Sequence, residues 1–209
     1  MSKSSARWLQ RQKTDRFVKL SKIEGYRSRA AYKLLEIQRK YRIFKKGMRV
    51  VDLGAAPGGF SEVAAACVSS QGTVLACDLL VMPPLANVDF IQGDFTAAAT
   101  VLAIKSRLNA PADVILSDMA PNMSGISSVD QASGMHLAEL ALDFVLDNLK
   151  DTGIMVLKLF QGEGFAEYLQ ELRHKFKTVK IVKPEASRQE SKEVYVVASL
   201  LKQVSRSIE

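Results

Sequence analysis

The stretch VVDLGAAPGGFSE, residues 50–62, decides the fold class. An apolar run with strand character ends in a glycine-rich turn, and a helical pattern follows over residues 59–69. In an open α/β sheet, such a turn after the first strand lets a ligand approach the backbone at the carboxyl ends of the strands. Gly54, Gly58 and Gly59 do not have the G-x-G-x-x-G spacing of dinucleotide-binding proteins, which argues against a dehydrogenase.

Outward from this stretch, apolar strand-like runs alternate with helical patterns. The runs are MRVVDLG, GTVLACDLL, NVDFIQGD, ADVILSDMA, GIMVLKLF, KTVKIVKP and KEVYVVASL, and the further helical patterns cover residues 97–108, 131–149 and 163–176. This alternation is typical of a doubly wound α/β sheet with helices on both faces. The last two runs leave no room for a helix between them, so we expect a hairpin and an antiparallel final strand.

Composition narrows the class of protein. With 209 residues, 47% hydrophobic and 24% charged, the chain is expected to form one soluble globular domain, cytoplasmic and monomeric, with no membrane span or signal segment. Cys67 and Cys77 lie in apolar segments without ligand spacing, and His136 and His174 stand alone, so we expect reduced core thiols and no metal site.

Positive charge is concentrated near the N-terminus. Residues 1–49 hold 16 Lys or Arg and 3 Asp or Glu, a net charge of +13, whereas the whole chain carries +7. Aromatic residues are interleaved with this charge: Trp8, Phe17, Tyr26, Tyr32 and Tyr41. The mixture suits phosphates and stacked bases, and favours a nucleic-acid partner over a merely solvated face. We therefore divide the chain into a basic extension, residues 1–26, and a single domain, residues 27–209.

A membrane surface is a weaker alternative for the basic segment. The segment RSRAAYKLLEIQRKYRIF has a narrow apolar stripe, which is better suited to docking on a protein core. The stripe consists of Ala30, Leu34, Ile37 and Tyr41.

Acidic residues occur at the ends of successive predicted strands. Asp52 precedes the glycine-rich turn, Asp78 ends the second strand and Asp94 follows the third. A carboxylate at the position of Asp78 can accept hydrogen bonds from both hydroxyls of a ribose, so the set favours a nucleoside ligand. A tight strand-to-helix connection without a ligand is the simpler alternative for the turn alone.

Together the segments DLGAAPGGFSE, CDLL, QGDF, SDMAPNMSG, KLFQGEGF and EVYVVA resemble the FtsJ-type ribose 2′-O-methyltransferases over nearly the whole chain. The resemblance implies a Rossmann-like class I methyltransferase fold, in which seven strands form a mostly parallel sheet with the last strand antiparallel. It also implies S-adenosylmethionine as cofactor, bound by Gly54, Gly58, Phe60, Asp78, Asp94 and Asp118. Phe60 stands where the family often has Trp, a change expected to keep an aromatic contact.

Family members carry a Lys-Asp-Lys-Glu tetrad, and the resemblance places it at Lys33, Asp118, Lys158 and Glu193. Lys158 is otherwise hard to explain, because it lies within an apolar strand where an ammonium loses its water. It either takes the proton of the attacking hydroxyl or stays charged, orients the oxygen and stabilises its developing charge. A lysine that only pairs with an acid at the strand end is the structural alternative.

The function implied is methylation of a ribose, expected on a uridine, in large-subunit ribosomal RNA within an assembled particle. Transfer RNA is the main alternative substrate, and a non-catalytic RNA-binding assembly factor is the alternative class. Amino-group methylation is disfavoured because the chain has SDMAP instead of an Asn/Asp-Pro-Pro-aromatic turn. Methylation of a cytosine carbon is disfavoured because neither cysteine lies in a Pro-Cys motif.

Overall fold

A seven-stranded sheet forms the centre of the computed structural model, which describes residues 15–202. The strands are β1 (Arg49–Leu53), β2 (Thr73–Asp78), β3 (Val88–Gln92), β4 (Ala112–Ser117), β5 (Leu149–Phe160), β6 (Phe176–Val182) and β7 (Glu193–Leu201). Their order is β3-β2-β1-β4-β5-β7-β6, and β7 runs antiparallel to both of its neighbours while the pairs among the first five strands are parallel. The predicted doubly wound sheet with an antiparallel last strand is confirmed.

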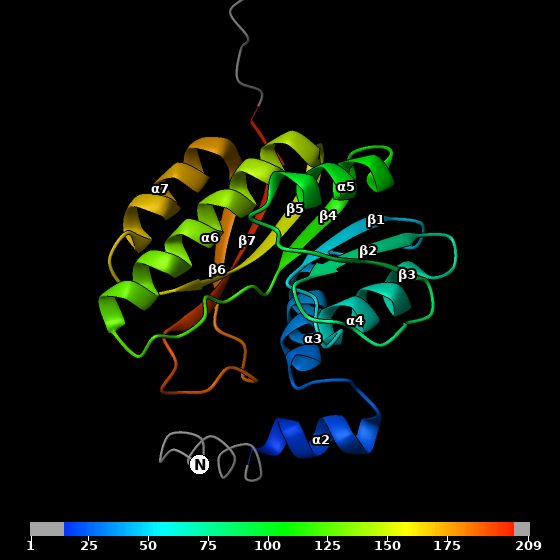
Figure 1. Cartoon of the computed structure of the whole chain (residues 1–209), viewed down its shortest axis with the longest axis horizontal. Helices are drawn as coiled ribbons and strands as arrows, with labels where there is room; N and C mark the ends of the chain where they lie inside the picture. The colour runs from blue at the N-terminus through cyan, green and yellow to red at the C-terminus, as the bar shows by residue number, and fades with distance from the viewer. Residues whose placement is uncertain (1–14, 203–209) are drawn as a thin grey trace, which may run out of the picture.

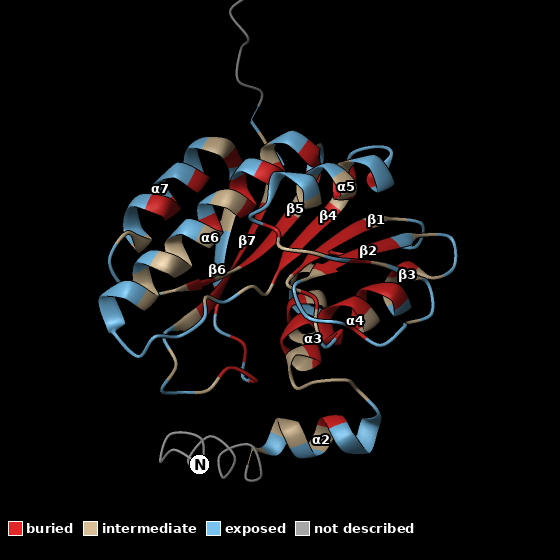
Figure 2. Cartoon of the chain, in the orientation of Figure 1, coloured by how far each residue is buried: buried red, intermediate tan, exposed pale blue. Residues whose placement is uncertain are grey.

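Helices cover both faces of the sheet (Figure 1). Their bounds are α2 (Arg16–Glu24), α3 (Ala30–Tyr41), α4 (Gly59–Val68), α5 (Ala98–Leu108), α6 (Ser127–Asn148) and α7 (Phe165–Lys175). One apolar cluster joins the sheet to α5, α6 and α7, and a second joins the opposite face to α3 and α4. Both faces of the central strands are therefore buried, as Figure 2 shows, which explains their near-continuous apolar sequences.

Successive residues of a strand contribute to opposite clusters. On β5, Met155 and Leu157 face α6 and α7, whereas Val156 faces α3 and α4. Lys158 continues the second series, so the strand period places its side chain on the α3 side. On β7, Tyr195 belongs to the same side and pairs with Lys158 across the two strands.

The N-terminal region contains a helix that the sequence interpretation did not anticipate. Asp15 caps α2 by accepting hydrogen bonds from Phe17 N (3.0 Å) and Val18 N (3.3 Å), and Gly25 ends the helix with φ 81°. In Figure 1, α2 lies beyond α3, away from the sheet. Part of the predicted basic extension, including Trp8, lies outside the described residues.

The apolar stripe predicted on the next helix packs on the core. Leu34 and Ile37 are fully buried in the cluster shared by α3 and α4, and Tyr41 packs against it. The helix therefore docks on the sheet domain through this stripe.

Helix α6 begins four residues before the predicted start. Its Asp130 accepts hydrogen bonds from Ser124 N (2.6 Å) and Gly125 N (3.2 Å), so polar residues stabilise the first turn and no apolar period marks it in the sequence.

Candidate active site

The acids predicted at strand ends lie along one edge of the sheet. Asp78 is the last residue of β2, Asp94 follows β3, and Asp118 follows β4 directly. Lys158 lies two residues before the end of the parallel strand β5. Because β7 runs in the opposite direction, its first residue, Glu193, pairs with the last residue of β5 and reaches the same edge.

Asp78 organises the loops at this edge. Its Oδ2 accepts a hydrogen bond from Ala56 N (2.9 Å) in the glycine-rich turn, and its Oδ1 accepts one from Leu80 N (2.8 Å) in the loop after β2. Each carboxylate oxygen has a second lone pair, so both oxygens retain the capacity to accept a ligand hydroxyl.

Asp94 is also held by its own loop. Its Oδ1 accepts hydrogen bonds from Thr96 N (2.8 Å) and Thr96 Oγ1 (2.7 Å), and these bonds lower its pKa below the ordinary value for aspartate. The hydrogen bonds thus favour the ionised form of this carboxylate at the sheet edge.

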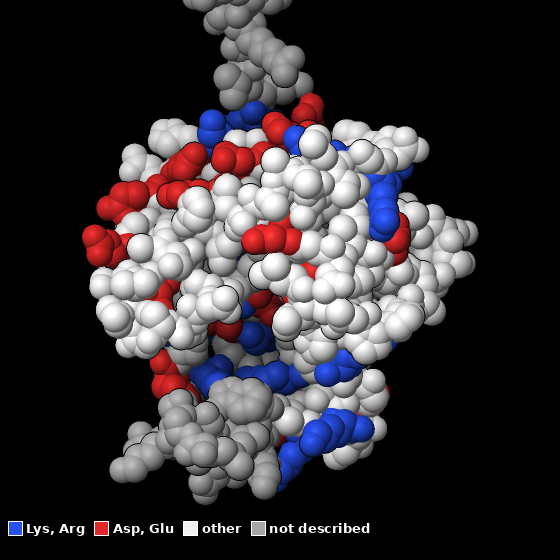
Figure 3. All heavy atoms as spheres, in the orientation of Figure 1, with Lys and Arg blue, Asp and Glu red and all other residues white. Residues whose placement is uncertain are grey.

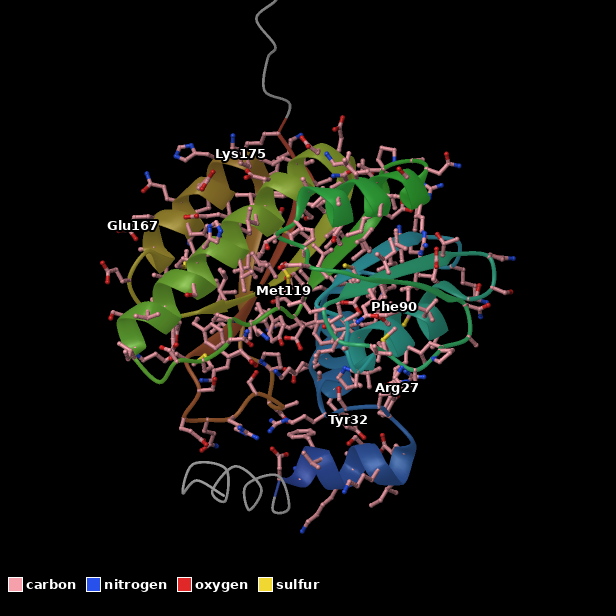
Figure 4. The ribbon with its side chains drawn as sticks, in the orientation of Figure 1. Arg27, Tyr32, Phe90, Met119, Glu167 and Lys175 are labelled. Atoms are coloured by element: carbon pink, nitrogen blue, oxygen red, sulfur yellow. The ribbon has the colours of Figure 1, made fainter. Side chains whose placement is uncertain are left out.

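Space beside the glycines is filled mainly by the protein itself. At Gly54, where φ is +75°, an added Cβ would lie 2.6 Å from Met119 Cγ, and at Gly58, where φ is +109°, it would lie 3.0 Å from Arg27 Cδ. At Gly59 it would lie 2.2 Å from Ser28 Oγ. Figure 4 shows Met119 near the centre of the molecule and Arg27 beside α4. The turn therefore needs glycines so that other protein segments can approach.

Phe60 lies in the core, where it makes an aromatic contact with another protein residue. Its side chain is 2% exposed, and its ring centroid is 5.9 Å from that of Tyr195. Any direct contribution to a cofactor site would come from its backbone amide in the first turn of α4, where no side chain caps the helix.

Asp52 is fully buried beneath α4. Its Oδ2 accepts a hydrogen bond from Ser61 Oγ (2.6 Å), whereas Oδ1 has no hydrogen-bond partner among the described residues. Burial, with the charges of Asp118 and Asp78, raises the pKa of Asp52 to about 7 despite the bond from Ser61. A carboxyl group therefore sits within the site in a form that titrates near neutrality.

The first ion pair of the predicted tetrad joins β5 to the end of β4. Lys158 Nζ lies 3.1 Å from Asp118 Oδ1 and also donates a hydrogen bond to the Asp118 backbone oxygen. Only 7% of the Lys158 side chain and 19% of the Asp118 side chain are exposed. An ammonium has three donors, so a third N–H of Lys158 remains for a substrate oxygen.

The second ion pair joins α3 to β7. Lys33 Nζ lies 2.6 Å from Glu193 Oε1, with 11% and 13% of the two side chains exposed. Glu193 Oε1 also accepts a hydrogen bond from Ser187 Oγ (2.8 Å). This second carboxylate is therefore held from both sides.

Tyr195 connects the two ion pairs, and the sequence interpretation did not identify it. Its hydroxyl donates to Asp118 Oδ1 and accepts from Lys33 Nζ at 3.2 Å, while the side chain is fully buried. The signal available was its spacing: Tyr195 follows Glu193 by two residues on one strand and therefore shares its face. The four predicted tetrad residues thus belong to one network closed by a fifth.

Electrostatics within the network favour charged carboxylates. Burial alone would raise the pKa of Asp118, but Lys158, Lys33 and the hydrogen bond from Tyr195 outweigh it and lower that pKa. Burial and the neighbouring Asp118 raise the pKa of Tyr195 well above its ordinary value, so its hydroxyl stays a donor. Two ammonium groups balance two carboxylates, which offsets the cost of burying them.

Charge on the visible face is divided between two regions. In Figure 3, Lys and Arg side chains gather around a hollow between α2 and the rest of the protein, whereas Asp and Glu gather over α6 and α7. A polyanion would be drawn toward the hollow and repelled from the helices opposite.

Neither a membrane span nor a metal centre is found in the part of the chain that the structure describes. No helix there is both long enough and apolar enough to cross a bilayer, and no group of three or more His, Cys, Asp or Glu side chains is arranged to hold an ion.

Known proteins resemble this chain along most of its length. A protein from Hahella chejuensis (strain KCTC 2396), named Ribosomal RNA large subunit methyltransferase E, is 54% identical over 198 residues, which cover 94% of this chain and 96% of the relative. A protein of the same name from Stenotrophomonas maltophilia (strain K279a) is 52% identical, with 94% of each chain covered.

A solved structure also resembles this chain. The crystal structure of a Plasmodium falciparum protein, described as a ribosomal RNA methyltransferase, superimposes with a TM-score of 0.75 at 27% identity, covering 84% of this chain and 98% of that one. The family model for FtsJ-like methyltransferases matches residues 26–200. The chain therefore belongs to the FtsJ-like methyltransferase family.

Proposed function

We propose that the protein uses S-adenosylmethionine to methylate the 2′ oxygen of a ribose, expected to be that of a uridine, in large-subunit ribosomal RNA. The observation that carries this proposal is the network of Lys158, Asp118, Tyr195, Lys33 and Glu193 at the same sheet edge as the glycine-rich turn. Two curated relatives named as large-subunit ribosomal RNA methyltransferases support the choice of RNA. Action on ribosomal RNA would place the protein in the cytoplasm.

The residues at the sheet edge fit the cofactor chemically. Asp78 keeps lone pairs for the ribose hydroxyls, and Asp94 offers an ionised carboxylate. The uncapped first turn of α4 offers N–H groups to the carboxylate of the amino-acid tail. Leu79 and Leu80, 59% and 68% exposed, follow Asp78 and supply apolar surface for a purine.

When bound, S-adenosylmethionine would supply a methyl group on a cationic sulfur: the C–S bond would break as the C–O bond to the ribose forms, S-adenosylhomocysteine would leave, and the hydroxyl proton would pass to water, directly or by way of Lys158. Lys158 would donate its remaining N–H to that oxygen, which orients a lone pair and stabilises the negative charge that develops there. Asp118 holds the Lys158 ammonium through two oxygens and so fixes its position. Lys33, held by Glu193, would help to fix Asp118 through Tyr195.

The basic N-terminal region would bind the RNA backbone. We propose that residues 1–26 form an RNA-binding extension of a single methyltransferase domain, residues 27–209. Helix α2 carries Arg16, Lys19 and Lys22, and it borders the hollow around which basic side chains gather in Figure 3. Such a surface supplies affinity without sequence information, so the target nucleotide would be selected by the shape of its RNA or particle.

The test uses large ribosomal subunits, naked ribosomal RNA and transfer RNA from cells lacking this protein, each incubated with S-adenosylmethionine carrying a labelled methyl group. Nuclease digestion and mass spectrometry should find one 2′-O-methylated uridine in the large-subunit RNA, with label transfer to particles exceeding transfer to naked RNA. Label on transfer RNA instead would establish the alternative substrate. RNA binding without label transfer to any of these substrates would favour a non-catalytic assembly factor.

A further inference from the structure

Residues 27–29, which we call the arginine strap, contact the loops around Asp78 and also the loop that leads to Glu193. We propose, resting on the function proposed above, that the arginine strap positions two separate groups of loops at the active site. Arg27 sets the cofactor loops, and Arg29 sets the loop that holds Glu193. The two arginines are two positions apart in the connection between α2 and α3.

Arg27 ties together two loops that frame Asp78. Its Nη1 donates to Pro57 O (3.3 Å) in the glycine-rich turn and to Pro83 O (2.6 Å), and its Nη2 donates to Pro84 O (2.6 Å). The two latter carbonyls belong to the loop that connects β2 to β3. One guanidinium therefore fixes the separation of two segments that would lie on either side of a cofactor.

The first residues of the loop after β2 have little side-chain packing, whereas Met82, which follows them, is buried. Leu79, Leu80 and Val81 are 59%, 68% and 72% exposed, so side-chain packing does little to hold that stretch. Arg27 is itself well placed, because its backbone N donates to Glu62 Oε1 (2.8 Å) on α4. Its stem also lies against Gly58, where an added Cβ would be 3.0 Å from Arg27 Cδ.

Arg29 contacts the loop between β6 and β7. Its guanidinium pairs with Asp15, the cap of α2, and donates to the backbone oxygen of Ala186 in the loop between β6 and β7. Arg188 of the same loop also approaches Asp15, with Nε 3.8 Å from Oδ2. Only 16% of the Arg29 side chain is exposed.

The loop held by Arg29 leads directly to the tetrad. Ala186 is followed by Ser187, whose hydroxyl donates to Glu193 Oε1 (2.8 Å), and Glu193 pairs with Lys33 (2.6 Å). Ala186 and Ser187 are 1% and 6% exposed, so this loop segment packs as part of the core. A shift of the loop would therefore move the carboxylate that holds Lys33.

The two arginines should consequently affect different kinetic parameters. Arg27 supports loops that would contact the cofactor, so its loss should weaken cofactor affinity. Arg29 supports a network that would act on the RNA and on the transition state, so its loss should lower kcat. A role in folding alone would predict the same phenotype for both.

The experiment compares Arg27→Lys, Arg27→Ala, Arg29→Lys and Arg29→Ala in the full chain. Calorimetry with S-adenosylhomocysteine should show Kd about tenfold higher for Arg27→Ala, with the KM for S-adenosylmethionine rising in step and kcat within about twofold of wild type. Arg29→Ala should lower kcat about tenfold, with Kd for S-adenosylhomocysteine unchanged. The lysine variants keep the positive charge but lack the planar set of N–H donors of a guanidinium. Each should therefore change the same parameter as the alanine variant, by a smaller factor.

Arg107→Ala is the matched control, because Arg107 also contacts one carboxylate and one backbone oxygen, Asp89 and Phe90 O, both at 3.2 Å. It should leave both parameters unchanged. Amide hydrogen exchange without ligand tests the strap independently of activity: Arg27→Lys should raise exchange in residues 79–87, and Arg29→Lys in residues 184–192.

Matching kinetic defects in both arginine variants, or unchanged exchange in both loops, would overturn the proposal. The exchange result stands even if the proposed function fails, since that failure would appear as a wild-type protein that transfers no methyl group to RNA.

Discussion

The hydroxyl of Tyr195 donates a hydrogen bond to Asp118 Oδ1, although the two residues are 77 positions apart in the chain. Tyr195 lies on β7 and Asp118 follows β4, so the bond crosses over the intervening strand β5. It turns two separate ion pairs into one network, and it places a neutral donor between two ammonium groups.

Replacing Tyr195 with Phe should test this connection. The ring keeps its contact with Phe60, so thermal unfolding should stay close to wild type. Asp118 loses a hydrogen bond that lowers its pKa, and Lys33 loses an acceptor. Methyl transfer should fall about tenfold, with affinity for S-adenosylhomocysteine retained. A rate within twofold of wild type would mean that the ion pairs act independently.

Lys158→Ala should lower methyl transfer by about a thousandfold or more while RNA and S-adenosylhomocysteine still bind, because the loss lies in the transition state. Lys158→Arg separates the two possible roles: partial recovery indicates an orienting charge, whereas an equally inactive variant that still binds both ligands indicates a general base. Lys150→Ala is the control, since Lys150 lies on the same strand and pairs with Asp113. Should Lys158→Ala remain within threefold of wild type, the lysine is only an ion-pair partner.

Asp78→Ala should weaken binding of S-adenosylhomocysteine by about 1–3 kcal/mol, because a charged acceptor is lost and two loop amides lose their partner. Calorimetry measures the effect, and circular dichroism should remain native. Asp113→Ala is the control: Asp113 also accepts a backbone hydrogen bond, from Arg49 N (2.8 Å), but lies near the other end of β4. Equal affinity of wild type and Asp78→Ala would remove Asp78 from the ribose site.

Asp52 should make folding stability depend on pH. Its pKa is raised by burial to about 7 in the folded state, from 3.8 as the reference, so the folded state binds the proton more tightly than the unfolded state. The stabilisation is complete below pH 3.8 and is lost as pH rises toward 7. Asp52→Asn mimics the protonated acid, so its free energy of unfolding relative to wild type should rise by about 3 kcal/mol between pH 5 and pH 8. Chemical denaturation at the two pH values measures this difference, and a constant difference would show that Asp52 ionises normally.

Gly59→Ala should destabilise the fold by about 1–3 kcal/mol through overpacking, because the new Cβ would lie 2.2 Å from Ser28 Oγ. The next nearest atoms to this Cβ would be Ala31 N at 3.3 Å and Ser28 Cβ at 3.5 Å, which are far less severe contacts. Ser28→Ala should therefore restore most of the stability in the double variant. If Ser28→Ala gave no recovery in denaturant titrations, the cost would come from the backbone and not from this hydroxyl.

Local sequence patterns predicted the sheet well, because strand period, helical period and connection length are all local properties. The short connection between the last two strands was enough to predict the antiparallel β7. The shared edge of Asp78, Asp94 and Asp118 was also predictable, since parallel strands end on the same side.

Contacts between residues far apart in the sequence could not be predicted from local patterns. The bond between Lys33 and Tyr195 spans 162 positions and depends on β7 lying beside β5. The glycines were interpreted as room for a ligand, yet Arg27 and Ser28 lie against Gly58 and Gly59. Nothing in the local sequence pairs these segments.

The reversed direction of β7 has a consequence for the newly made protein. Residues of the network occur early, in the middle and late in the chain, and β7 lies between β5 and β6 rather than at the sheet edge. A nascent chain that has reached β6 has Lys33, Asp118 and Lys158 but neither Glu193 nor Tyr195, and β5 and β6 lack the strand that joins them. The network can therefore be completed only after β7 has been synthesised and has left the ribosome that made it.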